Sequence, residues 1–281
     1  MIYRISIVKY EPKAAGSHAR LAVMSRRQPL PLPLHTAEVA IVTGEGTMGT
    51  HVVHPATGGP HPTVLFFMDA PGKRPLLHRM AAAIASHGYY VMLPNLYYRQ
   101  TPAFELDFTS AESLARMAEL MRAVGNRMVA RDAQALIEHA DSDPAADATR
   151  IATVGYCMSG PFSLFVAAEQ AERVRCAASF YGVRLHIDSA DSPHHRLGDI
   201  RGEIYVAAAE HDDYVPLDMI TRLEAARVAA GTRGRVEVYW GTHHGFAFDD
   251  RPAYDPVADD RHWTELLDLF ARNLAPGEPL R

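Results

Sequence analysis

The sequence is poor in cysteine, with only Cys157 and Cys176 among 281 residues. So few cysteines in a chain of this length do not form a disulfide framework, so we interpret both as free thiols of a reducing cytoplasm. No apolar run approaches the roughly 18 residues that span a bilayer. The amino-terminal stretch MIYRISIVKYEPK lacks the apolar core of a secretory signal. We therefore expect a cytoplasmic protein without a membrane partner.

The sequence also lacks a basic stripe, and its formal net charge is −5. Nucleic-acid-binding domains usually carry clustered lysine and arginine, so we expect no nucleic-acid partner. The fifteen histidines form no H-x-x-x-H pattern on a predicted helix. A zinc site would need more ligands at tighter spacing than the two cysteines offer. We accordingly expect no metal and no cofactor.

The sequence does contain enough apolar residues for a sizeable core, because 48% of it is hydrophobic and 22% charged. Residues 1–36 look separate from the rest, since alternating prolines at residues 28–33 favour an extended segment without a core. We expect a poorly ordered extension over residues 1–36 and one domain over residues 37–281.

Strand-like and helix-like segments alternate from residue 37 onward. Continuous apolar runs such as TVLFFM (63–68) are typical of strands buried on both faces. The alternation predicts βαβ units and a mostly parallel, doubly wound sheet of eight strands flanked by helices. The predicted strands are 38–42, 50–54, 63–68, 89–94, 151–156, 175–182, 203–209 and 235–240, and the predicted helices are 75–87, 110–124, 126–140, 158–170, 216–230 and 262–273.

The motif GYCMSG, at residues 155–160, lies directly between a predicted buried strand and a predicted helix. This is the context of the nucleophile elbow, the G-x-S-x-G turn of the α/β-hydrolase fold. Because the nucleophile is held in a strained conformation, its flanks must be small, and here they are Gly155 and Ser159. The helix amino terminus favours a thiolate at Cys157. A buried structural cysteine is the alternative interpretation, and it fits Cys176 better.

Candidate partners for Cys157 follow two later strands, in the order nucleophile, acid, histidine that this fold requires. The first loop offers Asp212 or Asp213, and the second offers His243 or His244. Both loops follow the carboxyl ends of predicted parallel strands, where active sites of such sheets lie. Two loops with these residues in this order are more specific than a lone solvated aspartate or histidine.

Over residues 37–275 the sequence resembles the dienelactone hydrolase family, whose members include carboxymethylenebutenolidases. The resemblance rests on GYCMSG (155–160), D-x-x-V-P (212–216), HGF (244–246) and PNLYYRQ (94–100). The family's elbow reads GYC-x-GG, so Ser159 is a departure. The resemblance implies an α/β-hydrolase fold.

Matched position by position, the family's residues fall on a defined set in this chain. Its triad falls on Cys157, Asp212 and His244, and its oxyanion-hole amides fall on Ala70 and Met158.

Three further matches concern charge. A family glutamate that helps to generate the thiolate corresponds to Asp69, and a family arginine that binds the substrate carboxylate corresponds to Arg99. A second substrate-binding arginine of the family is replaced by Phe248. This replacement leaves the exact substrate open.

The chemistry of a cysteine nucleophile restricts the substrate independently of the resemblance. A thiol with a pKa near 8.5 leaves a tetrahedral intermediate far more readily than an alkoxide does. Enol lactones, aryl esters and thioesters, whose leaving groups are stabilised, are therefore favoured over alkyl esters and amides. We expect a carboxylic ester hydrolase that opens a carboxylate-bearing enol lactone, of the dienelactone-to-maleylacetate type found in aromatic degradation.

Three alternatives stay open. The same site could act on another activated ester or on a thioester. The chain could instead be a non-catalytic binding protein with the α/β-hydrolase fold, although an intact triad argues against that interpretation. A redox-sensing thiol is disfavoured because the sequence shows no resolving cysteine near Cys157. We expect a monomer or a weak homodimer.

Overall fold

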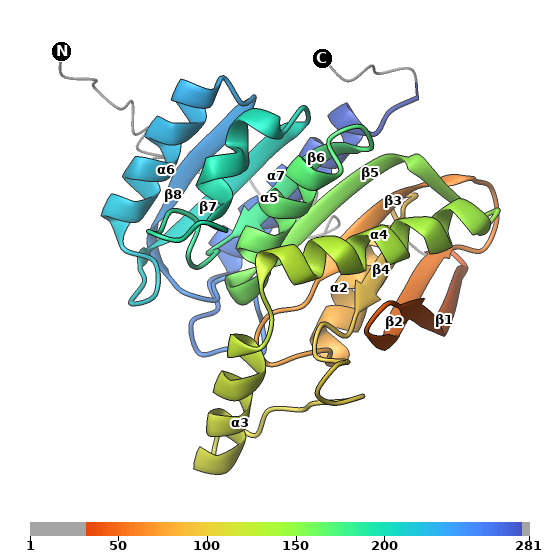
Figure 1. Ribbon diagram of the computed structural model, residues 1–281, viewed down its shortest axis with the longest axis horizontal. Helices are drawn as coiled ribbons and strands as arrows, with labels where there is room; N and C mark the ends of the chain where they lie inside the picture. The colour runs from red at the N-terminus through yellow and green to blue at the C-terminus, as the bar shows by residue number, and fades with distance from the viewer. Residues whose placement is uncertain (1–31, 277–281) are drawn as a thin grey trace.

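The computed structural model describes residues 32–276 as one eight-stranded sheet with helices on both faces (Figure 1). The strand order is β1-β2-β4-β3-β5-β6-β7-β8. The strands are β1 (Leu34–Thr43), β2 (Gly46–Pro55), β3 (His61–Phe67), β4 (Tyr90–Pro94), β5 (Ala146–Tyr156), β6 (Val174–Phe180), β7 (Glu203–His211) and β8 (Gly234–His243). The sheet is parallel from β4 to β8, while β2 runs antiparallel to both β1 and β4.

The helices form two layers. Figure 1 shows α4, α5 and α6 on one face of the sheet and α2 and α7 on the other, with α3 extending beyond the sheet. The helices are α2 (Pro75–Ala85), α3 (Ala111–Arg122), α4 (Asn126–Ser142), α5 (Gly160–Glu169), α6 (Leu217–Ala230) and α7 (Pro256–Asn273), with short 3-10 helices η1 (Cys157–Ser159) and η2 (Pro193–Asp199). Within residues 32–276, none of the helices combines the length and apolar character that a bilayer crossing needs.

The central strands are covered on both faces, as their continuous apolar runs predict. In β3, every residue from Thr63 to Phe67 is fully buried. The chain passes from β3 outward to β4 and then returns to β5 on the other side of β3. The crevice where strand order reverses, outside the carboxyl ends of β3 and β5, is the usual ligand site of such sheets.

The structure corrects two predicted boundaries. Strand β1 begins at Leu34, which pairs with Pro55 of β2, so residues 34–36 belong to the sheet and not to the extension. Helix α7 begins at Pro256, six residues before the predicted 262, because the Asp255 side chain caps it by accepting from the N–H groups of residues 257 and 258. Residues 1–31, which form most of the predicted extension, lie outside the described residues.

Candidate active site

Cys157 lies at the carboxyl end of β5, where the chain turns into α5. Its φ is 54°, a left-handed conformation that costs a non-glycine residue roughly 1–2 kcal/mol. Among the described residues, the other non-glycine residues with positive φ are Tyr181 and Arg184, which follow the neighbouring strand β6. Backbone strain of this kind persists where surrounding structure enforces it, and it often clusters at functional sites. The strained residues therefore gather at one edge of the sheet.

The elbow has the tight packing that its small flanking residues predict. A Cβ atom at Gly155 would lie 2.1 Å from the Ser159 carbonyl oxygen, so glycine is required there. The Tyr156 N–H donates to Ser159 Oγ over 2.9 Å, and Ser159 Oγ donates to the Phe67 carbonyl oxygen over 3.0 Å. The serine that departs from the family's glycine thus ties the elbow to the end of β3.

The structure brings Asp212 and His244 together from the ends of β7 and β8. His244 Nδ1 lies 2.7 Å from Asp212 Oδ2, and the Asp212 side chain is fully buried. The neighbouring candidates lie elsewhere, because Asp213 is exposed and the ring of His243 lies 5.0 Å from that of His211. Asp212 and His244 are therefore the pair with the geometry of an orienting acid and its base.

The second ring nitrogen of His244 is free to act on Cys157. Nε2 is buried and has no well-aligned hydrogen-bond partner within residues 32–276. Burial alone would lower the pKa of His244, but the hydrogen bond with Asp212 and the interaction with Cys157 raise it to about 9. The rings of Tyr181 and Tyr214 pack edge-on against the imidazole, with centroids 5.0 and 5.1 Å away. Near neutral pH the interactions with Asp212 and Cys157 favour an imidazolium beside the cysteine.

The pKa of His244 provides a direct test of its contact with Cys157. In the wild-type protein the His244 ring should titrate near pH 9. In Cys157→Ala the interaction with the sulfur is lost, so the titration should move to lower pH. Histidine ring resonances followed by NMR across pH would measure both values.

His194 supplies the internal control, because burial and the nearby His186 and His195 lower its pKa to about 4 independently of Cys157. Its titration should be the same in both proteins. An unchanged His244 titration in Cys157→Ala would show that the two residues do not interact.

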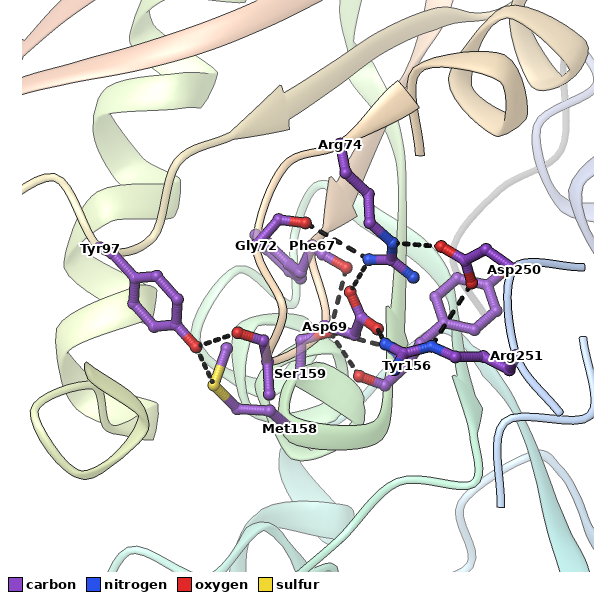
Figure 2. Close-up of polar contacts among 11 residues, drawn as sticks. Phe67, Asp69, Gly72, Arg74, Tyr97, Tyr156, Met158, Ser159, Asp250 and Arg251 are labelled. Atoms are coloured by element: carbon purple, nitrogen blue, oxygen red, sulfur yellow. Dashed lines mark hydrogen bonds and ion pairs between the residues drawn. The ribbon is translucent and has the colours of Figure 1, made fainter. Parts of the chain in front are cut away.

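The expected oxyanion-hole residues, Ala70 and Met158, lie at the ends of β3 and β5 and are nearly fully buried. Tyr97 joins them, because its hydroxyl donates to the Ala70 carbonyl oxygen over 2.7 Å and contacts Met158 Sδ at 3.4 Å (Figure 2). Their backbone amides therefore sit on two loops that a shared tyrosine holds together. Such fixed N–H groups can stabilise an oxyanion without reorganising during the reaction.

Asp69 lies between two arginines and is almost completely buried (Figure 2). One carboxylate oxygen accepts from Arg74 Nη1, and the other lies 3.2 Å from Arg251 Nη2. Asp250 pairs with Arg74 and Arg251 in turn. Burial raises the pKa of Asp69, and the two arginines oppose that rise. In this arrangement Asp69 makes no hydrogen bond to Cys157, so assistance to the thiolate would first require its release from the arginines.

Arg99 has a different environment from the one that the resemblance implies. Its guanidinium binds both oxygens of Asp132, at 2.9 and 2.6 Å, and also donates to Glu45 over 2.6 Å. The guanidinium also stacks on the ring of Tyr98 at 4.4 Å. Because its donors are already used by acidic partners, Arg99 is not free to bind a substrate carboxylate. The role of Arg99 as a substrate anchor therefore stays a prediction, and it would require release of the guanidinium from Asp132 and Glu45.

Three residues near the site make contacts that no local sequence pattern predicts. Phe248 is buried under the guanidinium of Arg74, at 5.1 Å from ring centroid to carbon. Arg251, which reaches Asp69, is 182 positions away from it along the chain. Tyr181 is fully buried beside His244, and its hydroxyl has no partner within residues 32–276. Only the folded chain brings these residues to the elbow.

The described residues contain one group whose ligand atoms could surround a metal ion, formed by Glu38, His51 and His78, and these atoms lie within 4.8 Å of one another. Its carboxylate already has two partners, because Glu38 lies 2.9 Å from His51 Nδ1 and 2.8 Å from Lys73 Nζ. An ammonium bound to the carboxylate competes directly with a metal cation. These contacts therefore do not favour metal binding by Glu38, His51 and His78.

Comparison with known proteins identifies the family of this chain. The family model described as "Dienelactone hydrolase family" matches residues 48–274. A "Putative carboxymethylenebutenolidase" of Methylorubrum extorquens is 27% identical over 240 residues, covering 84% of this chain and 81% of the relative. A "Carboxymethylenebutenolidase" of a Pseudomonas species is 31% identical over 140 residues, covering 50% of this chain and 57% of the relative. A crystal structure titled "Putative Dienelactone Hydrolase", from Klebsiella pneumoniae, aligns with a TM-score of 0.77 at 23% identity, covering 85% of this chain and 99% of that one.

The parallel sheet, the strained elbow after β5 and the loops after β7 and β8 define an α/β-hydrolase fold. Because the family model covers most of the sequence, the chain belongs to the dienelactone hydrolase family. It is therefore a carboxylic ester hydrolase.

Proposed function

We propose that this chain hydrolyses activated carboxylic esters, with an enol lactone as the leading substrate, through a covalent thioester on Cys157. The observation that carries the proposal is the arrangement at the elbow. Cys157 has a strained backbone at the amino terminus of α5, beside a histidine that Asp212 orients and whose Nε2 is unpartnered. A nucleophile, a base and an orienting acid in this relation are the requirements of nucleophilic catalysis.

In the first step the Cys157 thiolate attacks the ester carbonyl, and the Ala70 and Met158 N–H groups donate hydrogen bonds to the developing oxyanion. The carbon–oxygen bond to the leaving group then breaks. A lactone yields an enolate that stays attached through the acyl group, and a proton from His244 neutralises the departing oxygen. An enol lactone of the dienelactone type would give a keto acid of the maleylacetate type after hydrolysis and tautomerisation.

The second step is deacylation, in which His244 must change from acid to base. Acylation removes the thiolate charge, so one contribution that raises the pKa of His244 disappears. The pKa of His244 then falls, and the neutral ring can accept a proton from water. Water adds to the thioester carbonyl, and the carbon–sulfur bond breaks to regenerate the thiolate. Asp212 keeps the ring oriented through both steps.

A prediction about His244 tests this mechanism. His244→Ala should slow deacylation on the order of a hundredfold, because the general base is lost while Cys157 remains. With a 4-nitrophenyl ester the acyl-enzyme should accumulate, visible as an added acyl mass on the intact protein. Rapid mixing should show a burst of nitrophenolate followed by a slow steady state.

His243→Ala is the matched control, because His243 is the exposed neighbour that does not contact Asp212. That variant should turn over without accumulating acyl-enzyme. Equal accumulation in the two variants would contradict the assignment of His244 as the base. A wild type that acts on none of the enol lactones, aryl esters or thioesters would favour a non-catalytic binding protein.

A further inference from the structure

A cavity of about 350 Å³ opens beside the elbow, at the junction of α3 and α4. Met158 of the expected oxyanion hole forms part of its wall, as do residues at the start of α5 and in the loop after β6. The volume lies at the lower end of the range for small-molecule sites. Most of the lining is apolar: Met121, Val124, Met158, Pro161, Phe162, Val183 and Ile187.

Two arginines line this apolar cavity. Arg122 and Arg184 are both exposed, and neither forms an ion pair with another residue in the described part of the chain. The cavity has one acidic lining residue, Asp191, whose carboxylate accepts from Ser189 Oγ over 2.6 Å. Two cations against one anion leave the lining with a net positive charge. This arrangement contrasts with Arg99, whose charge is already compensated by Asp132 and Glu45.

The buried side chain of Asn126 adds a polar group to the cavity wall. Asn126 is only 9% exposed, and its Nδ2 donates to the Asp191 carbonyl oxygen over 2.6 Å. Its Oδ1 is buried without a hydrogen-bond partner within residues 32–276. A buried unpaired acceptor costs roughly 1–3 kcal/mol, so it marks a place for a donor from a ligand or from water.

The same wall includes the amino terminus of α4, a helix of 17 residues. Its N-cap residue is Gly125, which has no side chain to cap the helix, and its first turn contains no acidic residue. The amino terminus of a helix favours an anion through its N–H groups and its dipole. The helix amino terminus and the two arginines therefore both contribute positive potential to the cavity.

We propose that this cavity binds the acyl part of an amphiphilic anionic ester, in which an apolar segment separates the anionic group from the scissile carbonyl. Arg122 and Arg184 would bind the anion, and the apolar wall would cover the segment between. Asn126 Oδ1 would accept from a hydroxyl or N–H elsewhere in the acyl part or from water, because an ionised carboxylate has no donor. The proposal rests on the proposed function and names the substrate class of the same site.

The acyl part is assigned to this cavity because of its position relative to His244. The leaving oxygen must lie near His244 to receive its proton. None of the cavity's lining residues belongs to the loops that carry Asp212 and His244. The cavity wall includes Met158 of the elbow but neither loop of the Asp212–His244 pair, so we assign the acyl part, and not the leaving group, to the cavity.

The test uses two esters with the same six-carbon acyl chain, mono-4-nitrophenyl adipate, which ends in a carboxylate, and neutral 4-nitrophenyl hexanoate. Wild type should prefer the adipate ester. In the double variant Arg122→Gln/Arg184→Gln, the ratio of kcat/KM for the two esters should fall about tenfold, as expected for two partly solvated charge contacts. Arg127→Gln is the matched control, because Arg127 is exposed on α4 and does not line the cavity. It should preserve the wild-type ratio.

A binding measurement separates this inference from the proposed function. Calorimetry with Cys157→Ala should show that adipate binds, and that the two arginine substitutions weaken its binding about tenfold. An unchanged ratio together with unchanged adipate binding would overturn the inference, even if the enzyme turns over both esters. Undiminished turnover by Cys157→Ala would instead overturn the proposed function, while adipate binding would still decide the role of the cavity.

Discussion

Replacing Cys157 with alanine is expected to lower kcat/KM for a 4-nitrophenyl ester by at least about ten-thousand-fold, because the covalent route disappears with the nucleophile. The fold should survive, since alanine occupies the same strained position and is no larger than cysteine. Purified wild type and Cys157→Ala, assayed with an enol lactone, an aryl ester and a thioester, would measure the loss. Circular dichroism and thermal unfolding would establish that the variant is folded.

Cys176→Ala is the matched control for this substitution. Cys176 is fully buried in β6, and burial raises the pKa of its thiol, so it remains a protonated core side chain. The variant should lose some stability through the small cavity that it creates and keep its activity. Loss of turnover in Cys176→Ala, with turnover retained in Cys157→Ala, would show that the elbow does not carry the nucleophile.

The sequence predicts the elbow well because its requirements are local. Gly155 and Ser159 lie within two residues of Cys157, and the steric conflict that excludes a larger side chain at Gly155 arises within the same turn. Asp212 and His244 are also predictable, since each directly follows a strand and a parallel sheet brings such ends to one edge. A short motif and a strand count therefore suffice for the candidate triad.

The charged surroundings of the site are not predictable in this way. Arg99 has its partners Asp132 and Glu45 at sequence separations of 33 and 54 residues. Which acid meets which arginine depends on how α4 and the β1–β2 turn pack, and no local pattern encodes that packing. Family position alone suggested that Arg99 was available for substrate. The fold shows instead that the arginine and the acids neutralise one another.

The pairing of Arg99 with acidic residues changes which arginines are available to bind an anionic substrate. Arg74 and Arg251 are held by Asp69 and Asp250, and Arg99 is held by Asp132. An arginine paired in a buried network would have to break its existing bonds before it could bind a carboxylate, and the bonds lost would offset those gained. The cavity beside Met158 offers arginines without such partners. We therefore infer the position of the substrate's anionic group from the arginines that have no acidic partner, and not from the position of a family motif.

Replacing Arg99 with methionine is expected to destabilise the protein by about 3 kcal/mol, because it leaves a buried carboxylate without its cation. Asp132 is only 1% exposed, and after the substitution its carboxylate keeps a hydrogen bond from the Tyr98 hydroxyl, 2.9 Å away. Urea unfolding followed by circular dichroism would measure the loss. The preference between carboxylate-bearing and neutral esters should stay at the wild-type value, since the guanidinium is already bound to Asp132 and Glu45.

Two companion variants show whether the buried charge is the cause. Arg116→Met removes an exposed arginine from its pair with Glu119 and should cost less than about 1 kcal/mol, as exposed pairs do. Adding Asp132→Leu to Arg99→Met removes the orphaned carboxylate, and Tyr98 keeps its hydrogen bond with Thr43, so much of the lost stability should return. If Arg99→Met is as stable as wild type and instead raises KM only for carboxylate-bearing esters, then Arg99 binds substrate and the ion pair seen here opens during catalysis.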